Sequence, residues 1–166
     1  RKRIGPSAHQ IGAHIRCGGF LADVNENIAM VTAEILSSIP QKMIELYNYQ
    51  QDSNETYFYL STDSSFAATY IAESMKPVTV VSTNLYSRGH STIGLTSNST
   101  LLRALMELHL VSQSNSLLLT SSSTFSRIIR WMSNASRVMV IHAPYTNTNA
   151  TWGNVRSQFQ KSRKLL

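Results

Sequence analysis

The amino-acid sequence predicts an α/β fold, in which helices cover both faces of a mostly parallel sheet. Short stretches rich in apolar, β-branched or aromatic residues alternate along the chain with segments whose apolar residues recur every three or four positions. Right-handed crossovers between parallel strands place the intervening helices on both faces of the sheet. The 166 residues are enough for one domain with its own hydrophobic core.

The first predicted strand covers Ile11–Arg16 and ends in a turn at Cys17, Gly18 and Gly19. Two successive glycines make a tight turn sterically easy, because glycine has no Cβ. The chain therefore reverses direction directly after an arginine at the end of a buried strand.

Two helices are expected next, separated by Pro40. The first runs from about Asn25, as its N-cap, to Ser38, and the second from Gln41 to about Gln50. The first helix is indicated by apolar residues at helical spacing, which are Ile28, Val31, Ile35 and Ile39.

The remaining elements follow from the same periodicities. They are a strand at Thr56–Ser61, a helix from Ser64 to about Met75 that Pro77 ends, a strand at Val78–Val81, a helix at Thr100–Val111, a strand at Leu117–Thr120, a helix from Ser123 to about Met132 and a strand at Val138–Ile141. Residues 83–98 are expected to form a long loop, and the chain from His142 onward has no periodicity. His109 is expected beside the apolar face of its helix, in a structural role.

The charge is unevenly distributed. There are 15 Lys and Arg against 9 Asp and Glu, a net charge of +6, and the last acid is Glu107. A C-terminal part without carboxylates favours an anionic ligand, although solvated cations near the chain ends explain much of the excess. Aromatic and basic residues do not alternate as in single-strand-binding proteins, so no nucleic-acid partner is expected.

The sequence excludes or disfavours several classes of protein and of active site. One cysteine excludes an internal disulfide framework, and no apolar run approaches the roughly 20 residues of a membrane span, so no membrane anchor is expected in this segment. The five histidines lack the spacing of a metal site, so no metal is expected, and a serine-hydrolase G-x-S-x-G elbow is absent. Cys17 beside His14 is disfavoured as a nucleophile, because side chains three residues apart on a strand point to opposite faces of the sheet.

Three polar clusters follow predicted strands, at residues 14–19, 61–63 and 120–124. Because ligands bind beyond the carboxyl ends of parallel strands, we expect the clusters to face one crevice. Neither a G-x-G-x-x-G nor a G-K-[ST] phosphate motif occurs.

Each cluster has two interpretations. Arg16 before a glycine turn suits phosphate or diphosphate binding, or else an ion pair with a surface acid. Ser123 and Thr124 suit anion binding at a helix N-terminus, or simple capping. Asp63 either accepts hydrogen bonds from a base or ribose, or caps the following helix.

Taken together, the clusters resemble the GDP-fucose-dependent fucosyltransferase superfamily, of the plant cell-wall and core types. His14-Ile-Arg16 looks like the family's H-x-R motif, and Tyr59-Leu-Ser-Thr-Asp63 is similar to its strand ending in a Thr-Asp pair. The segment Leu102–Phe125 resembles the family's helix, strand and S-T-F sequence, and is the most specific part. The resemblance spans roughly residues 10–141.

The resemblance implies one Rossmann-like half of a GT-B glycosyltransferase, the C-terminal half that binds the donor. The reaction implied is inverting, metal-independent transfer of fucose from GDP-fucose to a glycan or glycoprotein acceptor, with no cofactor. Arg16, as the catalytic residue, would hold the diphosphate and assist departure of GDP. The other implied donor-binding residues are His14 and Asp63 at the guanosine, and Ser123, Thr124 and Phe125 at the phosphate and donor.

The resemblance also implies an organisation and a location. Residues 1–9 would be a basic N-terminal segment, 10–145 the donor-binding domain and 146–166 a polar and basic tail. The acceptor-binding N-terminal half would be missing from this segment, which then has no identifiable general base. Residence in the Golgi or endoplasmic reticulum lumen is implied, and it is compatible with N-x-[ST] sequons at Asn54, Asn98, Asn134 and Asn149. The alternative is a non-catalytic α/β module that binds a nucleotide or sugar phosphate.

Overall fold

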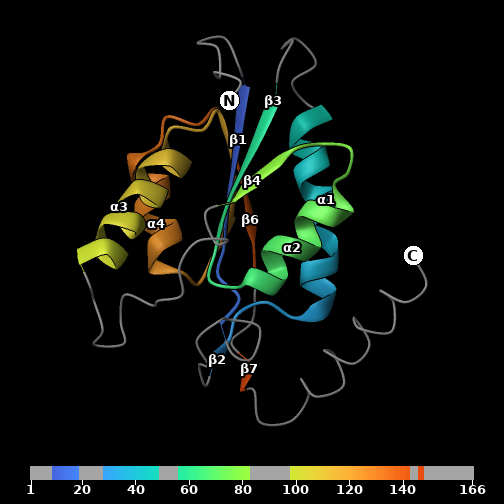
Figure 1. Ribbon diagram of the computed structural model, residues 1–166, viewed down its shortest axis with the longest axis horizontal. Helices are drawn as coiled ribbons and strands as arrows, with labels where there is room; N and C mark the ends of the chain where they lie inside the picture. Colours follow the sequence, from blue (N-terminus) through green and yellow to red (C-terminus); the bar gives the residue numbers. More distant parts are fainter. Residues whose placement is uncertain (1–8, 19–27, 49–55, 83–97, 143–145, 148–166) are drawn as a thin grey trace.

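In the computed structural model, residues 9–18, 28–48, 56–82, 98–142 and 146–147 are described. Five parallel strands form one sheet in the order β4-β3-β1-β5-β6 (Figure 1). Their bounds are β1 His9–Ile15, β3 Thr56–Thr62, β4 Val80–Ser82, β5 Ser116–Thr120 and β6 Arg137–Ile141. The fold is therefore the predicted α/β, Rossmann-like sheet.

The strand order contains one topological switch point. From β1 the chain adds β3 and then β4 on one side, and it then crosses to the other side of β1 to add β5 and β6. The two strands that flank the switch, β1 and β5, are hydrogen-bonded in parallel from Ile11↔Ser116 to His14↔Leu119. In doubly wound sheets, the crevice at such a point is where ligands bind.

Two helices cover each face of the sheet (Figure 1). Helices α1, Ala33–Asn48, and α2, Ser65–Ser74, pack on one face, while α3, Asn98–Ser112, and α4, Thr124–Met132, pack on the other. Side chains alternate between the two cores along each strand: Phe58 and Leu60 face α1 and α2, and Tyr59 faces α3 and α4. The sheet is thus buried on both faces, as continuous apolar strands require.

The prediction for residues 25–50 is wrong in its details. A single helix, α1, runs through Pro40, and the two residues Ile28–Ala29 form a strand, β2, that pairs with β7, Thr146–Asn147. The predicted cap Asn25 lies outside the described residues. A proline inside a helix costs about 3 kcal/mol. Four side chains of α1 buried in the core, at about 1.5–3 kcal/mol each, outweigh that cost; they are Leu36, Ile39, Met43 and Leu46.

Helix α3 is present as predicted, but only some of its apolar residues are buried. Leu108 and Val111 are in the core, whereas Leu101 and Leu105 are about half exposed and His109 is exposed as well. The structural role expected for His109 is therefore wrong. The side of the helix that faces the sheet carries Glu107, whose carboxylate binds Ser61 on β3.

The other elements differ from the prediction by one or two residues at their ends. Strand β4 begins at Val80, two residues later than predicted, because the Val78 N–H donates to the Met75 carbonyl at 2.8 Å and belongs to the preceding turn. Ser123 is the N-cap of α4, one of its two expected roles, and Ser64, not Asp63, is the N-cap of α2. Among the described helices none combines the length and the apolar character needed to span a bilayer.

Gly12, in the centre of β1, lies against the end of α3 and the residues that follow it. A methyl group there would overlap the Ser114 hydroxyl, and it would lie 2.9 Å from Ser114 Cβ and 3.1 Å from the Val111 carbonyl oxygen. Glycine is therefore required by space, because any side chain would push the end of α3 away from the sheet.

Gly12→Ala is expected to lower the free energy of unfolding by about 1–3 kcal/mol, the usual cost of overpacking. Urea unfolding of both proteins measures it. In a Ser114→Gly background, which removes the overlapping atoms, the same substitution should cost clearly less. An equal cost in both backgrounds would show that the contact with Ser114 is not the cause.

Candidate functional site

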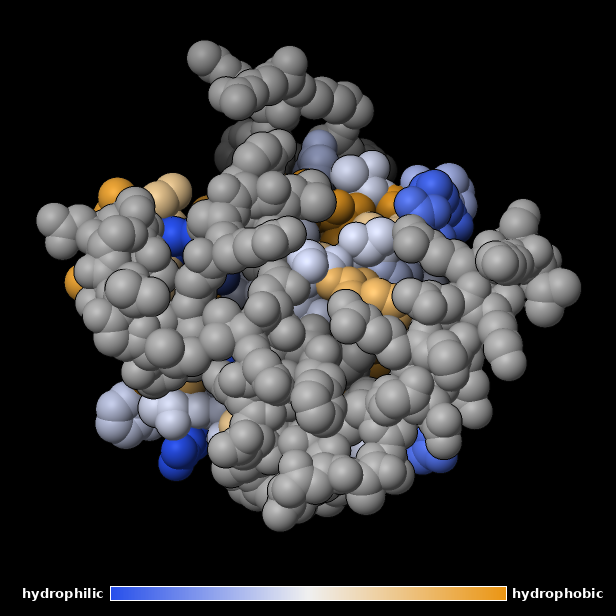
Figure 2. All heavy atoms as spheres, turned by 60° about the horizontal axis from the view of Figure 1, so that its bottom comes forward, coloured by the Kyte–Doolittle hydropathy of each residue, from blue (hydrophilic) through white to orange (hydrophobic). Residues whose placement is uncertain are grey.

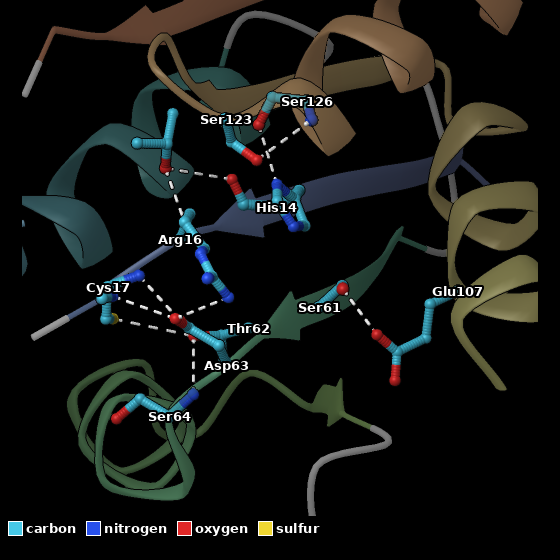
Figure 3. A network of polar contacts seen from close by, with 12 residues as sticks. His14, Arg16, Cys17, Ser61, Thr62, Asp63, Ser64, Glu107, Ser123 and Ser126 are labelled. Atoms are coloured by element: carbon cyan, nitrogen blue, oxygen red, sulfur yellow. Dashed lines mark hydrogen bonds and ion pairs between the residues drawn. The ribbon is translucent and has the colours of Figure 1, made fainter. Parts of the chain in front are cut away.

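The polar clusters predicted from the sequence meet at the carboxyl ends of β1, β3 and β5 (Figure 3). The hydroxyl of Thr120 joins two of them: it accepts from the Arg16 backbone N–H at 3.1 Å and donates to the His14 carbonyl at 3.3 Å. The ends of β1 and β5, about one hundred residues apart in the chain, are thereby fixed together at the switch point.

Asp63 joins the third cluster to the first. One carboxylate oxygen accepts from the Cys17 N–H at 2.7 Å, and the other accepts from the Gly18 N–H at 2.9 Å. The second oxygen also lies 3.1 Å from an Arg16 guanidinium nitrogen, and both side chains are mostly buried. Asp63 therefore fixes the position of the Arg16 side chain at the edge of the sheet.

The turn after β1 is built to bind an anion. Gly18 has φ 62°, a left-handed conformation that side chains disfavour, and it aligns two successive backbone N–H groups. In this structure the anion is the chain's own carboxylate, Asp63 (Figure 3). Of the two interpretations of Arg16, the ion pair is observed. Its partner is not a separate surface acid but Asp63, which belongs to the same site.

His14 lies on the other side of β1, under α4. Its Nδ1 is 2.7 Å from the Ser126 hydroxyl, and its ring centroid is 5.0 Å from that of Phe125. Complete burial and the nearby Arg16 charge lower the pKa of His14 to about 3. The imidazole is therefore neutral at physiological pH and acts as a hydrogen-bonding group, not as a cation or a proton donor.

The N-terminus of α4 faces the same edge. The Ser123 hydroxyl accepts from the Ser126 N–H at 3.4 Å, so Ser123 is a cap and is itself buried. Thr124 is exposed, and its hydroxyl accepts from the Arg127 guanidinium at 3.3 Å. No acid lies in the first turn of α4, so the helix dipole and Arg127 together make this end positive. Arg127 belongs to the C-terminal part without carboxylates, which the sequence indicates as favouring an anionic ligand.

Cys17 is not a nucleophile here. Its thiol is fully buried, 3.7 Å from the Thr62 hydroxyl. Burial and the neighbouring Asp63 carboxylate raise its pKa, so the unreactive thiol form predominates. This agrees with the low rank that the sequence gave to cysteine chemistry.

A second polar contact was not predicted. Buried Glu107 on α3 accepts from the Ser61 hydroxyl at 2.8 Å and pairs with Arg103 at 2.8 Å (Figure 3). The four-residue spacing of Arg103 and Glu107 on a helix is a signal for their ion pair. The contact with Ser61 depends on how α3 packs on β3, and no local pattern contains it.

Two further predictions concern metal and glycan sites. Within the described parts of the chain, no three His, Cys, Asp or Glu side chains are grouped as metal ligands. Of the four sequons, Asn134 is exposed after α4 and Asn98 is the first residue of α3. Asn54 and Asn149 lie outside the described residues.

Comparison with known proteins shows similarity in structure only. No protein-family model matches the chain, and no curated protein sequence matches it. NodZ alpha-1,6-fucosyltransferase co-crystallised with GDP aligns with TM-score 0.47 and 13% identity over 86% of this chain and 42% of that chain. Fucosyltransferase NodZ from Bradyrhizobium gives the same values. The form soaked with GDP-fucose gives a TM-score of 0.48, 14% identity and 44% of that chain covered. The chain thus spans less than half of these enzymes.

The burial of His14 predicts a pH-dependent stability. With a pKa near 6.5 unfolded and about 3 folded, the unfolded chain binds the extra proton between these values, so stability falls as pH falls below 6.5. From pH 7 to a pH of about 4.5 this one group is expected to cost about 2 kcal/mol.

The measurement is urea unfolding at both pH values for the unmodified chain and for His14→Gln, with His109→Gln as an exposed-histidine control. Only His14→Gln should make the acid-induced loss of stability smaller. An equal loss in the unmodified chain and in His14→Gln would contradict a buried, neutral His14.

Proposed function

We propose that this chain is the donor-nucleotide-binding half of a GT-B glycosyltransferase, which uses GDP-fucose and transfers fucose to a glycan or glycoprotein acceptor. The observation that supports this most is the grouping of Arg16, Thr120 and the N-terminus of α4 at the switch point between β1 and β5. In doubly wound sheets, this crevice binds nucleotides and their phosphates.

The choice of donor rests on the motifs. The segments that resemble the fucosyltransferase family, around His14, Asp63 and Ser123, are far apart in the sequence and adjacent in the structure. His14 packs against Phe125, and Arg16 pairs with Asp63, so each motif contacts another.

In the proposed reaction, Arg16 holds the diphosphate and stabilises the charge on departing GDP. The exposed Thr124 and the N-terminal N–H groups of α4 bind the phosphate oxygens. Fixed donors of this kind meet the leaving-group charge without a metal ion. Metal independence is therefore part of the proposal, and inversion is added to it from the resemblance of the motifs.

Two residues have roles that differ from simple donor contact. Both carboxylate oxygens of Asp63 bind this chain's own groups, so we assign Asp63 to holding Arg16 in place for the donor. His14 is neutral and buried, and it orients Ser126 and Phe125 at the start of α4. Ser123 caps the same helix and keeps its N-terminus in place.

The complete protein is proposed to include an acceptor-binding half, with the general base, beyond this segment. Residence in the Golgi or endoplasmic reticulum lumen is part of the same proposal. The exposed Asn134 sequon is the site at which a glycan would report that location.

A second candidate is a non-catalytic module that binds a nucleotide or sugar phosphate. One observation favours it: Asp63 occupies the two N–H groups of the Gly18 turn, which a phosphate would otherwise use. Donor binding then depends on Arg16 and the N-terminus of α4. An assay of fucose transfer by the full-length protein separates the two candidates.

GDP and GDP-fucose are expected to raise the melting temperature of the chain, and UDP is not, because a ligand that binds only the folded state stabilises it by mass action. Arg16→Gln should weaken GDP binding at least about tenfold, the loss of one charge-assisted contact. Thermal-shift titration measures both effects.

Lys76→Gln is the matched control, since Lys76 is an exposed cation that pairs with Glu73 on α2. Arg16→Lys, which keeps the charge next to Asp63, separates a loss of binding from a loss of folding. Equal stabilisation by UDP, or unchanged GDP affinity in a folded Arg16→Gln variant, would contradict the proposal.

A further inference from the structure

Helices α3 and α4 expose an apolar surface that the proposed donor site does not use. Trp131 is 93% exposed, and seven other large apolar side chains on these two helices are 38–59% exposed. We call this set the α3–α4 surface; its members are Leu101, Leu102, Leu105, Met106, Leu110, Ile128, Trp131 and Met132. Figure 2 shows hydrophobic side chains at the left edge of the molecule, the side on which α3 and α4 lie in Figure 1.

On each helix, the exposed apolar residues of this surface are spaced so that they lie on one side. On α3 the pairs Leu101–Leu105 and Leu102–Met106 are four residues apart, and on α4 Ile128 and Met132 are four apart. Residues at this spacing lie on the same side of a helix. The two helices pack against each other and share one core.

The outward orientation of these residues is fixed. On the opposite side of α3, Glu107 is held by Ser61, and Val111 is fully buried, so the helix cannot rotate to hide its leucines. Large apolar side chains that are exposed together on two packed helices indicate an interaction site.

The charges on this surface are positive and come from arginine. Arg127 and Arg130 are exposed on α4, and the acid on α3, Glu107, is buried and paired. The sequence from residue 98 to 142 contains no lysine, and it contains no acid after Glu107. Arginine binds carboxylates through two parallel hydrogen bonds and is enriched at protein interfaces, whereas lysine is depleted there.

The same charges disfavour two occupants from this chain. A symmetric dimer through the α3–α4 surface would place the arginines of one copy against the same face of the other. The C-terminal residues 148–166 carry Arg156, Lys161, Arg163 and Lys164 and no acid, so they would also be repelled.

We propose that the α3–α4 surface binds an amphipathic helix of a protein partner, with a row of apolar side chains flanked by Asp or Glu. Trp131 is the central anchor, because a fully exposed tryptophan gains most from burial at an interface. The methionines adapt their shape to the partner's side chains. Arg127 and Arg130 pair with the acidic flank of the bound helix. The proposal shares Arg127 with the positive end of α4, but it does not depend on donor binding.

The test uses a synthetic helical peptide of about 20 residues with leucine on one face and glutamate on its flanks, and a second peptide with lysine in place of glutamate. Fluorescence anisotropy with the full chain should give at least about tenfold tighter binding of the glutamate peptide. Trp131→Ala should weaken that binding by about tenfold or more. Arg130→Gln should weaken the binding by a smaller factor than Trp131→Ala does. Its effect should be larger at low salt than at high salt, because salt screens the charge.

Two controls match these variants. Tyr47→Ala removes an exposed aromatic side chain from α1, on the other face of the sheet, and Lys76→Gln removes an exposed cation there. Neither should change peptide binding, and Trp131→Ala should leave GDP binding unchanged. A failure of the surface is thereby distinguished from a failure of the donor site.

Three outcomes would overturn the proposal. Equal affinity for both peptides, or binding of neither, would remove the acidic helix as the occupant. Binding to vesicles with anionic lipids that Trp131→Ala abolishes, without binding of the glutamate peptide, would assign the surface to a membrane. Concentration-dependent dimerisation in analytical ultracentrifugation that Trp131→Ala abolishes would assign it to a second copy.

Discussion

The carboxylate of Asp63 is the contact on which the arrangement of the site depends. It lies at the end of β3, binds two N–H groups of the turn after β1 and pairs with Arg16. The same turn continues through the Cys17 carbonyl, which accepts from the Met30 N–H at 2.8 Å and so holds the segment before α1. One acid therefore positions a guanidinium, a backbone turn and the start of a helix.

At the carboxyl edge of the sheet, charged groups and the neutral imidazole differ in burial. Arg16 and the N-terminus of α4 supply positive charge at this edge. His14, two residues before Arg16, is completely buried and stays neutral. A charged imidazole at His14 would be repelled by Arg16 and would lose its hydration in the buried interior. A neutral imidazole packs against Phe125 and keeps the start of α4 in place. The geometry thus suits binding of an anion better than transfer of a proton.

Most of the fold was predictable, because apolar periodicity and turn residues act locally. The five sheet strands were predicted to within two residues at each end, and Ser64 and Ser123 were recognised as helix starts. The break at Pro40 was wrong, since core packing of α1 exceeds the local cost of proline. The buried side of α3 was not predicted, because leucines alone do not reveal that Glu107 has a hydrogen-bond partner on β3.

By itself, the sequence determined the α/β class, the order of the elements and the three polar segments at the ends of strands. These properties depend on side-chain periodicity and on residues close together in the chain. Only the tertiary structure decided which groups bind each other: Asp63 with the Gly18 turn, His14 with Ser126 and Glu107 with Ser61. These pairs are separated by 45, 112 and 46 residues, and only the pairing of parallel strands and the packing of helices on them bring such groups within hydrogen-bond distance.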